Sequence, residues 1–276
     1  MMTFNSFKRI KQALTYRTRL AHQAGEWPTR LSVVSLRNRG YSGSMRIIQI
    51  SDSHISRDCP TRTAELESCI QHINAADPQP DIVVHTGDIA HNGLAEEYII
   101  ARQLLDNLSA PYIVLAGNRD NRNELLKIFA DVCRLRLGDQ FVQYAVEHFD
   151  TRLICIDTVS DNSHKGRLCQ ARLAHIADML AADSSRPAVL LLHHPPLEVK
   201  VGPDGFQFEN WAEVDALQAL IREHRQIRGL FCGHVHRQAK ATLGLVPAHV
   251  ATCIASDLRW DKVPCCIYTH TLPSQE

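Results

Sequence analysis

The sequence predicts a single layered α/β domain that begins near residue 45. From Met45 onward, short apolar runs alternate with longer segments whose apolar residues recur every three or four positions. Alternation of this kind is typical of helices packed on a largely central sheet. After Gly233 the helical pattern stops, and shorter extended pieces follow with no helix between them. We therefore expect residues 45–276 to form one domain.

Six apolar runs are predicted to be strands. Each has four or five residues, is rich in β-branched residues or leucine, and is bounded by Gly, Pro or Asp, as expected for strands covered on both faces. Two later pieces are expected to close the fold as an antiparallel portion, namely Leu245–Ala251 and Cys265–Thr271. The six runs are Arg46–Ile50, Asp81–His85, Tyr112–Ala116, Leu153–Ile156, Ala188–Leu192 and Gly229–Cys232.

Four segments between these runs are predicted to be helices, because their apolar residues fall on one face. We expect Thr61 to cap the first of them. The apolar sets are Leu66, Ile70 and Ile73; Ile100, Leu104 and Leu108; Leu173, Ile176 and Leu180; and Val214, Leu217 and Ile221.

Composition excludes several classes of protein. The 276 residues carry 30 basic and 30 acidic side chains, so the chain as a whole is no polycation, and we expect no nucleic-acid polymer as a partner. The longest unbroken aliphatic run, Ala188–Leu192, is far shorter than the ~20 residues of a membrane span. The nine cysteines lack CxxC spacing and indicate reduced thiols in a cytoplasmic protein. The oligomeric state stays open, a homodimer included.

The balanced charge hides an asymmetry between residues 1–44 and the rest of the chain. Residues 1–44 hold eight basic side chains and one acidic one, giving +7, which leaves −7 for residues 45–276. Phe7, Ile10 and Leu14 have helical spacing among the basic residues, so the segment could form a basic amphipathic helix. We interpret residues 1–44 as a basic extension; a transit peptide or a membrane-surface helix is the alternative.

Polar side chains follow five of the six predicted strands at the point where each strand ends. Carboxyl ends of strands in an open α/β sheet meet at one edge, where ligands bind, so these residues are expected to converge. Each motif alone is common in turns, and their conjunction at successive strand ends carries the prediction. The residues are Asp52 and His54, Asp88, Asn118, His193 and His194, and His234 and His236.

The converging side chains share one chemistry. With His193 counted from the His193–His194 pair, two carboxylates, one amide oxygen and four imidazoles are oxygen and nitrogen donors, with no thiolate among them. Such a set suits Mn, Fe, Zn or Co, and iron and manganese are expected first. Seven donors exceed the needs of one tetrahedral site, so one bridging carboxylate would divide them between two ions. Two ions ~3.5–4 Å apart form the clamp that hydrolyses phosphate esters.

The order of these motifs resembles the calcineurin-like metallophosphoesterase superfamily over nearly all of residues 45–276. The motifs are Asp52-x-His54, Gly87-Asp88, Gly117-Asn118, His193 and Gly233-His234-x-His236. Further runs are similar to class III cyclic nucleotide phosphodiesterases and their glycerophosphodiesterase relatives: Gly93–Tyr98, Ile156–Thr158, Gly166–Leu168 and Cys232–His236.

The resemblance implies a four-layer α/β/β/α sandwich and two transition-metal ions. By it, Asp88 bridges two ligand sets. One set would be Asp52, His54, Asp88 and His236, and the other Asp88, Asn118, His193 and His234. His194 would lie behind the ligands, and with Asn118, Arg119 and His164 it is expected to help bind substrate. Asp88, Asn118 and Arg119 are the expected catalytic residues.

Arg119 departs from the family pattern, which reads Gly-Asn-His followed by an acidic residue. The family histidine is thought to contact phosphate and protonate the leaving oxygen. Arginine keeps the phosphate contact, but its pKa lies above ~12, so it cannot donate a proton near neutrality. His85, His164, His194 or a water could supply the proton instead, or the enzyme could prefer esters with better leaving groups.

The resemblance implies a phosphodiesterase that hydrolyses 3′,5′ or 2′,3′ cyclic nucleotides, and glycerophosphodiesters are the runner-up substrates. His91, His164 and Phe206 are candidates for recognising the base. Two other classes stay open. One is a scaffold that keeps the fold without hydrolysis, which Arg119 alone favours; the other gives residues 1–44 the main role, in binding a membrane or nucleic acid.

Overall fold

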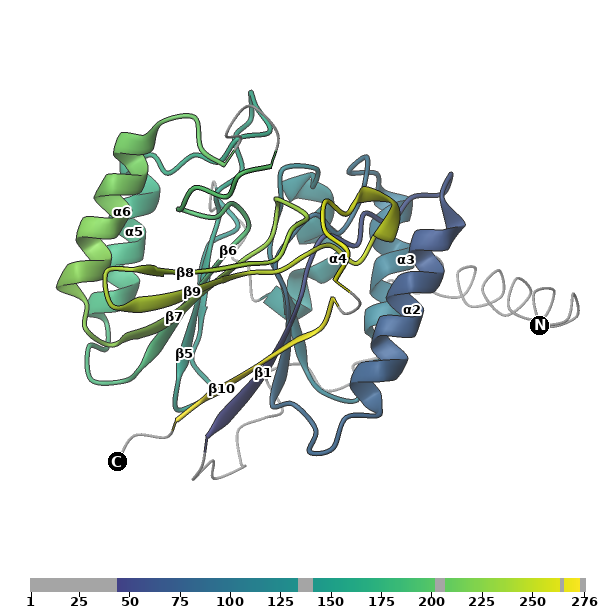
Figure 1. Ribbon diagram of the computed structural model, residues 1–276, viewed down its shortest axis with the longest axis horizontal. Helices are drawn as coiled ribbons and strands as arrows, with labels where there is room; N and C mark the ends of the chain where they lie inside the picture. The colour runs from purple at the N-terminus through teal and green to yellow at the C-terminus, as the bar shows by residue number, and fades with distance from the viewer. Residues whose placement is uncertain (1–43, 134–140, 202–206, 264–265, 274–276) are drawn as a thin grey trace, which may run out of the picture.

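The computed structural model describes residues 44–133, 141–201, 207–263 and 266–273. Within them, two sheets lie between two groups of helices, as Figure 1 shows. Helices α2 (Pro60–Asn74), α3 (Ala95–Leu105) and α4 (Arg122–Cys133) cover one side, and α5 (Gln170–Ala181) and α6 (Trp211–Glu223) cover the other. The predicted four-layer α/β/β/α sandwich is confirmed.

The first sheet has the strand order β10-β1-β2-β3. Its strands are β1 (Met45–Ile50), β2 (Ile82–His85), β3 (Tyr112–Val114) and β10 (Tyr268–Leu272). β1, β2 and β3 run parallel, and β10 is the antiparallel edge strand on β1. The carboxyl ends of β1, β2 and β3 therefore open onto the same edge.

The second sheet has the order β4-β5-β6-β7-β9-β8. Its strands are β4 (Tyr144–Val146), β5 (Arg152–Ile156), β6 (Ala188–Leu192), β7 (Ile227–Cys232), β8 (Ala239–Leu243) and β9 (Val246–Val250). β5, β6, β7 and β9 are mutually parallel, while β4 and β8 are antiparallel to their neighbours.

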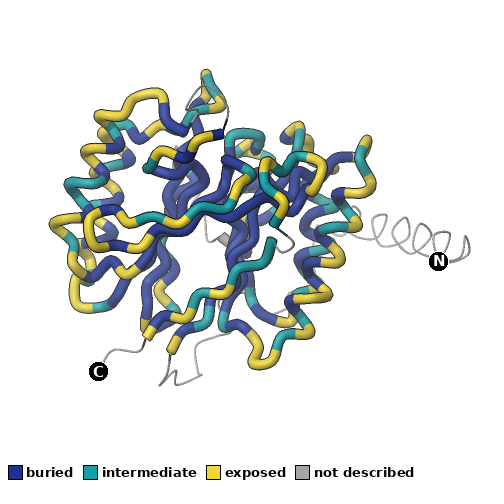
Figure 2. The backbone as a smooth tube through the Cα atoms, viewed as in Figure 1, coloured by how far each residue is buried: buried dark blue, intermediate teal, exposed yellow. Residues whose placement is uncertain are grey.

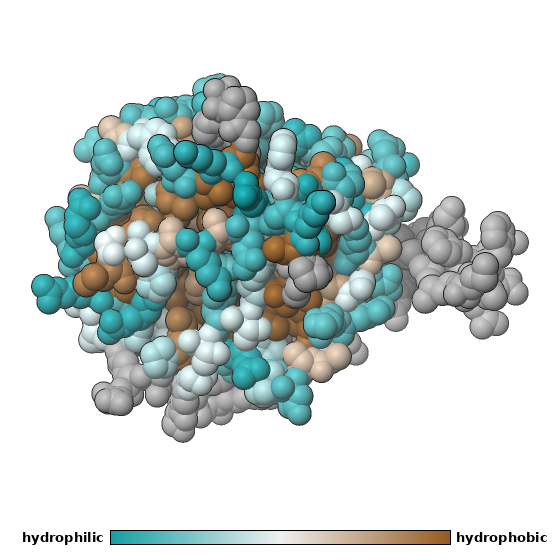
Figure 3. Space-filling model, viewed as in Figure 1, coloured by the Kyte–Doolittle hydropathy of each residue, from teal (hydrophilic) through white to brown (hydrophobic). Residues whose placement is uncertain are grey.

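Strands of the second sheet alternate between two apolar cores. Leu153 and Cys155 of β5 belong to the core between the sheets, whereas Ile154 and Ile156 belong to the core under α5 and α6. All four side chains are fully buried, which accounts for the continuous apolar run in the sequence. Figure 2 shows the same pattern, with buried strands in the centre and exposed outer helix faces. On the face shown in Figure 3, hydrophilic side chains lie over these outer helices.

The elements differ from the sequence prediction in a few places. Helix α4 and strands β4 and β8 were not predicted. Leu245–Ala251 was expected to be antiparallel, but β9 pairs in parallel with β7 and only β8 is antiparallel to it. Thr61 is not the cap of α2, because the helix starts at Pro60 with Cys59 in the N-cap position.

Two sequence predictions fall outside the described residues. Residues 1–43 are among these, so the basic extension stays a prediction; β1 begins at Met45, where the sequence places the start of the domain. Phe206 also lies outside the described residues. Among the helices that the structure describes, none has the length and apolar character needed to cross a membrane.

Candidate metal centre

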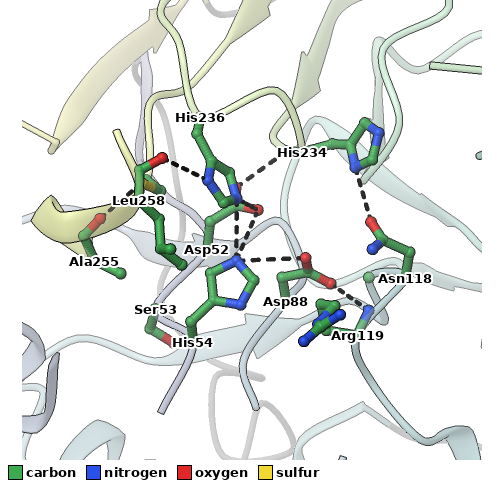
Figure 4. A network of polar contacts seen from close by, with 12 residues as sticks. Asp52, Ser53, His54, Asp88, Asn118, Arg119, His234, His236, Ala255 and Leu258 are labelled. Atoms are coloured by element: carbon green, nitrogen blue, oxygen red, sulfur yellow. Dashed lines mark hydrogen bonds and ion pairs between the residues drawn. The ribbon is translucent and has the colours of Figure 1, made fainter. Parts of the chain in front are cut away.

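Loops after five parallel strands meet at one edge of the two sheets. Asp52 and His54 follow β1, Asp88 follows β2, Asn118 follows β3, His193 follows β6, and His234 and His236 follow β7. Figure 4 shows side chains from β1, β2, β3 and β7 loops pointing toward one another. The convergence expected from the sequence therefore occurs, between residues up to 184 positions apart.

The backbone at this edge is held in an uncommon conformation. Among the described residues, the non-glycine residues with positive φ are Asp52, His54, Asp88, His234 and His236. Their φ values lie between 45° and 74°, in the left-handed region that β-carbons disfavour. All five are predicted ligands. Strained backbone of this kind is found where a functional site requires a particular side-chain direction.

Four side chains form the first group of donors. His54 Nε2 lies 3.0 Å from His236 Nε2 and 3.5 Å from Asp88 Oδ2, and His236 Nε2 lies 3.3 Å from Asp52 Oδ1. Candidate ligand atoms of Asp52, His54, Asp88 and His236 all lie within 4.8 Å of one another. This is the first of the two sets that the resemblance implies.

A second group forms on the other side of Asp88. Asn118 Oδ1 lies 3.1 Å from His193 Nε2 and 2.8 Å from His234 Nδ1, while Asp88 Oδ1 lies 3.5 Å from His193 Nε2. Asp88 therefore presents Oδ2 to the first group and Oδ1 to the second. This placement is the one that a bridging carboxylate requires.

The donor atoms fit two cations. Ligands that bind one ion at about 2.1 Å lie about 3.0–3.4 Å apart when the angle between them is near 90° to 109°. The 3.0 Å and 3.3 Å separations in the first group match this spacing. Asp52 Oδ1 is buried and has no hydrogen-bond partner among the described residues, a costly state that a bound cation would relieve. Oxygen and nitrogen donors without thiolate suit the transition metals expected from the sequence.

The buried carboxylates shift the pKa values of the neighbouring imidazoles toward the charged form. Burial favours neutral Asp52, but the neighbouring imidazoles of His236 and His193 together outweigh burial and lower its pKa to about 2. Burial likewise opposes protonated His236 and His193, yet the carboxylates raise their pKa values to about 11 and about 9. The carboxylates thus favour positive charge at these two imidazoles, and a bound metal cation would supply that charge in their place.

Hydrogen bonds behind the ligands fix their orientation. His193 Nδ1 bonds the Thr86 carbonyl at 2.8 Å and His236 Nδ1 bonds the Leu258 carbonyl at 2.9 Å, so Nε2 of each ring points into the site. His54 Nδ1 lies 3.4 Å from His91 Nδ1. The Thr86 and Leu258 contacts could not be predicted from residue patterns, because the accepting groups are backbone carbonyls, which every residue carries.

Asp120 is a site residue that sequence reasoning missed. Its buried carboxylate accepts hydrogen bonds from the backbone N–H groups of Ile89, Ala90 and Gly117, and from the Tyr98 hydroxyl. It thereby joins the loop that carries Asp88 to the loop that carries Asn118. Burial and the nearby Asp88 charge raise the Asp120 pKa to about 7.

The predicted substrate residues occupy three different places. The Arg119 backbone N–H donates to Asp88 Oδ1 at 2.7 Å, and its Nε donates to the His91 carbonyl at 3.0 Å. His164 is exposed, and its Nδ1 lies 3.3 Å from Asn118 Nδ2. His194 is fully buried, with Nδ1 at 2.8 Å from Thr158 Oγ1 and Nε2 at 3.1 Å from the His164 carbonyl.

The sequence of residues 45–238, most of the chain, matches the family model of the calcineurin-like phosphoesterases. The chain belongs to the calcineurin-like phosphoesterase family. Members of this family use a dinuclear metal centre, in agreement with the donor atoms that lie on both sides of Asp88. The match covers every predicted ligand from Asp52 to His236.

Relatives of this calcineurin-like phosphoesterase carry related names. It is 30% identical to a "Probable glycerophosphodiester phosphodiesterase GpdQ" of Arcobacter nitrofigilis, over 79% of this chain and 82% of the relative. It is 32% identical to a "Probable cyclic nucleotide phosphodiesterase" of Rhodopseudomonas palustris, over 79% and 81%. A solved dimetal phosphatase from Danio rerio has the same fold, with a TM-score of 0.63 and 14% identity over 77% of this chain and 88% of that one.

Proposed function

We propose that this chain is a dinuclear-metal phosphodiesterase that hydrolyses cyclic nucleotides to nucleoside monophosphates. The observation that carries the proposal is the placement of seven donors on the two sides of Asp88. The Rhodopseudomonas palustris relative, which is named a "Probable cyclic nucleotide phosphodiesterase", supports the substrate class. Glycerophosphodiesters are the second candidate, favoured by the Arcobacter relative.

We assign the ligands as the donor spacing indicates. Asp52, His54 and His236 would hold one ion, Asn118, His193 and His234 the other, and Asp88 both. Iron and manganese are the metals proposed, with zinc or cobalt as alternatives. When bound, two such ions supply Lewis acidity toward phosphoryl oxygens and lower the pKa of water.

The residues around the ligands would bind and orient the phosphodiester. Arg119 is half-buried beside Asp88, and its guanidinium is a fork of donors that matches phosphate oxygens. His164 and the Asn118 amide would flank the ester from the other side. His194 would act through His164, whose carbonyl it holds, because its own ring is fully buried.

The proposal is tested by a hydrolysis screen with defined metals. The substrates are 3′,5′-cAMP, 2′,3′-cAMP, glycerophosphocholine and bis-p-nitrophenyl phosphate, each with Mn or Fe. We expect turnover of a cyclic nucleotide, close to two metal equivalents per chain, and loss of both in Asp88→Asn. Asp150→Asn, which removes an exposed carboxylate away from the site, is the matched control.

Two results would contradict the proposal. One is less than one equivalent of transition metal after supplementation, which would favour a scaffold without hydrolysis. The other is undiminished turnover by Asp88→Asn. Preference for glycerophosphocholine over both cyclic nucleotides would keep the metal centre and replace the substrate class with the second candidate.

A further inference from the structure

The loop between β5 and α5 reaches from the second sheet to the candidate metal centre. It spans residues 157–169, whereas most connections between a strand and a helix have roughly 2–6 residues. Its first residues, 157–160, are buried. Its outer part carries the exposed His164, whose Nδ1 lies 3.3 Å from Asn118 Nδ2. The place of His164 beside a candidate ligand therefore depends on the contacts that hold this loop.

Arg122, at the start of α4, binds the loop at three points. Its Nε and Nη2 donate to the two carboxylate oxygens of Asp157, at 2.7 Å and 2.9 Å. Its Nη2 also donates to the Val159 carbonyl at 2.7 Å, and its Nη1 donates to Asp161 Oδ1 at 2.6 Å. All three nitrogens of the guanidinium are thus used on one loop, in a fork that a lysine cannot reproduce.

Asp157 is the buried anchor among these contacts. Its side chain is fully buried, and it accepts two further hydrogen bonds from the backbone N–H groups of Val142 and Val159, at 2.8 Å and 2.9 Å. Bidentate pairs of arginine and carboxylate are strong and fix geometry. A buried carboxylate that loses its arginine keeps an uncompensated charge, so removal of Arg122 should release the start of the loop. The Asp161 side chain is 75% exposed, and its ion pair contributes less.

A buried histidine fixes the same loop from within. A carbonyl can only accept, so Nε2 of the His194 ring donates to the His164 carbonyl at 3.1 Å, and Nδ1 accepts from the Thr158 hydroxyl at 2.8 Å. Gly166 packs directly on this ring, because a β-carbon there would lie 2.8 Å from His194 Cγ. The loop is therefore held by His194 and by Arg122, and the His164 side chain is left to face Asn118.

We propose that Arg122 is a positioning residue, which holds the loop of residues 157–169 so that His164 lies against Asn118 and can contact the phosphodiester. The inference rests on the proposed phosphodiesterase function. It adds a residue whose hydrogen bonds, among the described residues, all go to this loop and none to a candidate metal ligand.

A double-mutant cycle on the full-length, Mn²⁺-loaded chain tests the proposal. The kcat and KM for bis-p-nitrophenyl phosphate are measured for wild type, Arg122→Ala, His164→Ala and the double variant. We expect each single variant to lose about 10- to 100-fold in kcat/KM, because a small displacement of a positioned group has a large effect on rate. Both should divide the loss between kcat and KM in the same way. Because Arg122 acts through His164, the double variant should be no slower than His164→Ala.

Arg152→Ala is the matched control. Arg152 lies at the opposite end of β5, is 1% exposed and donates to both oxygens of Glu147, so this variant also separates a buried arginine from its carboxylate. It should lower Tm and leave kcat/KM unchanged. Arg122→Lys keeps a charge beside Asp157 without the fork, and its smaller loss should also disappear when His164 is absent. This second variant keeps the test decisive if Arg122→Ala does not fold.

Two measurements separate the loop from the metal centre. Calorimetric titration with Mn²⁺ should give the same affinity for Arg122→Ala as for wild type. Amide hydrogen exchange, measured by mass spectrometry without metal or substrate, should be faster in residues 157–165 of Arg122→Ala and unchanged in His164→Ala.

Three results would overturn the proposal. They are losses from Arg122→Ala and His164→Ala that multiply in the double variant, a fall in Mn²⁺ affinity that accounts for the loss in Arg122→Ala, and unchanged exchange in the loop. A wild-type chain that binds no Mn²⁺ and hydrolyses no phosphodiester would refute the proposed function. The exchange comparison would still decide whether Arg122 holds the loop, so the two failures can be told apart.

Discussion

At the scale of single residues, position 119 separates two roles that one side chain would otherwise combine. Its backbone N–H donates a hydrogen bond to Asp88 Oδ1, which any residue at this position other than proline could do. Its side chain is bound to the His91 carbonyl through Nε and presents a permanent positive charge beside the donors. We infer that Arg119 stabilises charge on the phosphodiester, while proton donation to the leaving oxygen falls to another group.

Arg119→His tests this division. A histidine can donate a proton near neutral pH, and general acid assistance is worth about 10²–10⁴-fold. We expect kcat for a cyclic nucleotide, whose leaving group is a poor alkoxide, to rise by about 10-fold or more, with a smaller change in KM. Bis-p-nitrophenyl phosphate releases p-nitrophenolate, a stabilised leaving group that needs no proton. We therefore expect kcat for this substrate to rise little in Arg119→His. Equal kcat for variant and wild type across pH 6–9 on the cyclic nucleotide would exclude a leaving-group role for this position.

The meeting of these seven side chains at one edge of the sheets could be predicted from the sequence because each follows a strand in a short motif. Their grouping around Asp88 followed only from the family resemblance, and the support from Asp120 could not be worked out from residue patterns. Asp120 accepts hydrogen bonds from backbone N–H groups 30 and 31 positions earlier as well as from that of Gly117, and such contacts exist only after the strands have paired. The same holds for His164, which reaches Asn118 from a loop 46 positions away.

At the scale of elements, the strand-end loops approach one another so closely that some glycines cannot be replaced. A β-carbon on Gly233, after β7, would overlap Ser51 Oγ and Asp52 Oδ2 of the β1 loop. Gly229, within β7, has room, since a β-carbon there would first meet the Phe231 ring at 3.4 Å. Gly229, which lies within β7 and has room for a β-carbon, therefore provides a control for Gly233, which follows the same strand and has none.

Gly233→Ala should displace the Asp52 carboxylate and weaken metal binding. We expect a loss of about 10- to 100-fold in affinity for the ion held by Asp52, the range seen when support behind a ligand is removed. Calorimetric titration with Mn²⁺ measures the loss, and circular dichroism checks that the variant is folded. Gly229→Ala should bind Mn²⁺ like the wild type; if both variants bound alike, close packing at Gly233 would not matter.

Elements buried on both faces were the ones that the sequence predicted best. Ala188–Leu192 was predicted with its observed bounds, since continuous burial gives a continuous apolar run. Strand β8 was missed because it is an edge strand with partly exposed and exposed residues alternating until Leu243. Helix α4 was missed although Leu125, Phe129 and Val132 recur at helical spacing and are buried, so the sequence carried that signal.

At the scale of the whole molecule, one glutamine joins the two sheets. Gln49 of β1 is fully buried, and its Nε2 donates to the Cys232 carbonyl of β7 at 2.8 Å. Its Oε1 accepts from His249 Nδ1 of β9 at 3.0 Å and from His270 Nε2 of β10 at 3.1 Å. Both imidazoles must keep a proton on the nitrogen that faces Gln49. The His270 ring also stacks on Phe231 of β7, with centroids 3.8 Å apart.

This arrangement makes the stability of the sandwich depend on pH. Burial lowers the pKa of His249 to about 4, with a further contribution from Lys240. Burial, followed by His249 and Lys240, lowers the pKa of His270 to about 3. In the unfolded chain both would titrate near 6.5, so below that pH the unfolded state binds more protons than the folded state. The free energy of unfolding should therefore fall as pH decreases from about 6.5 toward 4, by up to about 1.4 kcal/mol per pH unit for each histidine.

His270→Gln measures the contribution of His270 to the pH dependence of the free energy of unfolding. Glutamine keeps an N–H donor for Gln49 but cannot titrate, so the variant loses the stacked ring at every pH and loses one histidine's share of the pH dependence. Urea unfolding at intervals between pH 4 and pH 7 should give a smaller slope for His270→Gln than for wild type. His72→Gln, which removes an exposed histidine from α2, is the control and should leave the slope unchanged. Identical slopes for all three proteins would mean that His270 is not held neutral between the sheets.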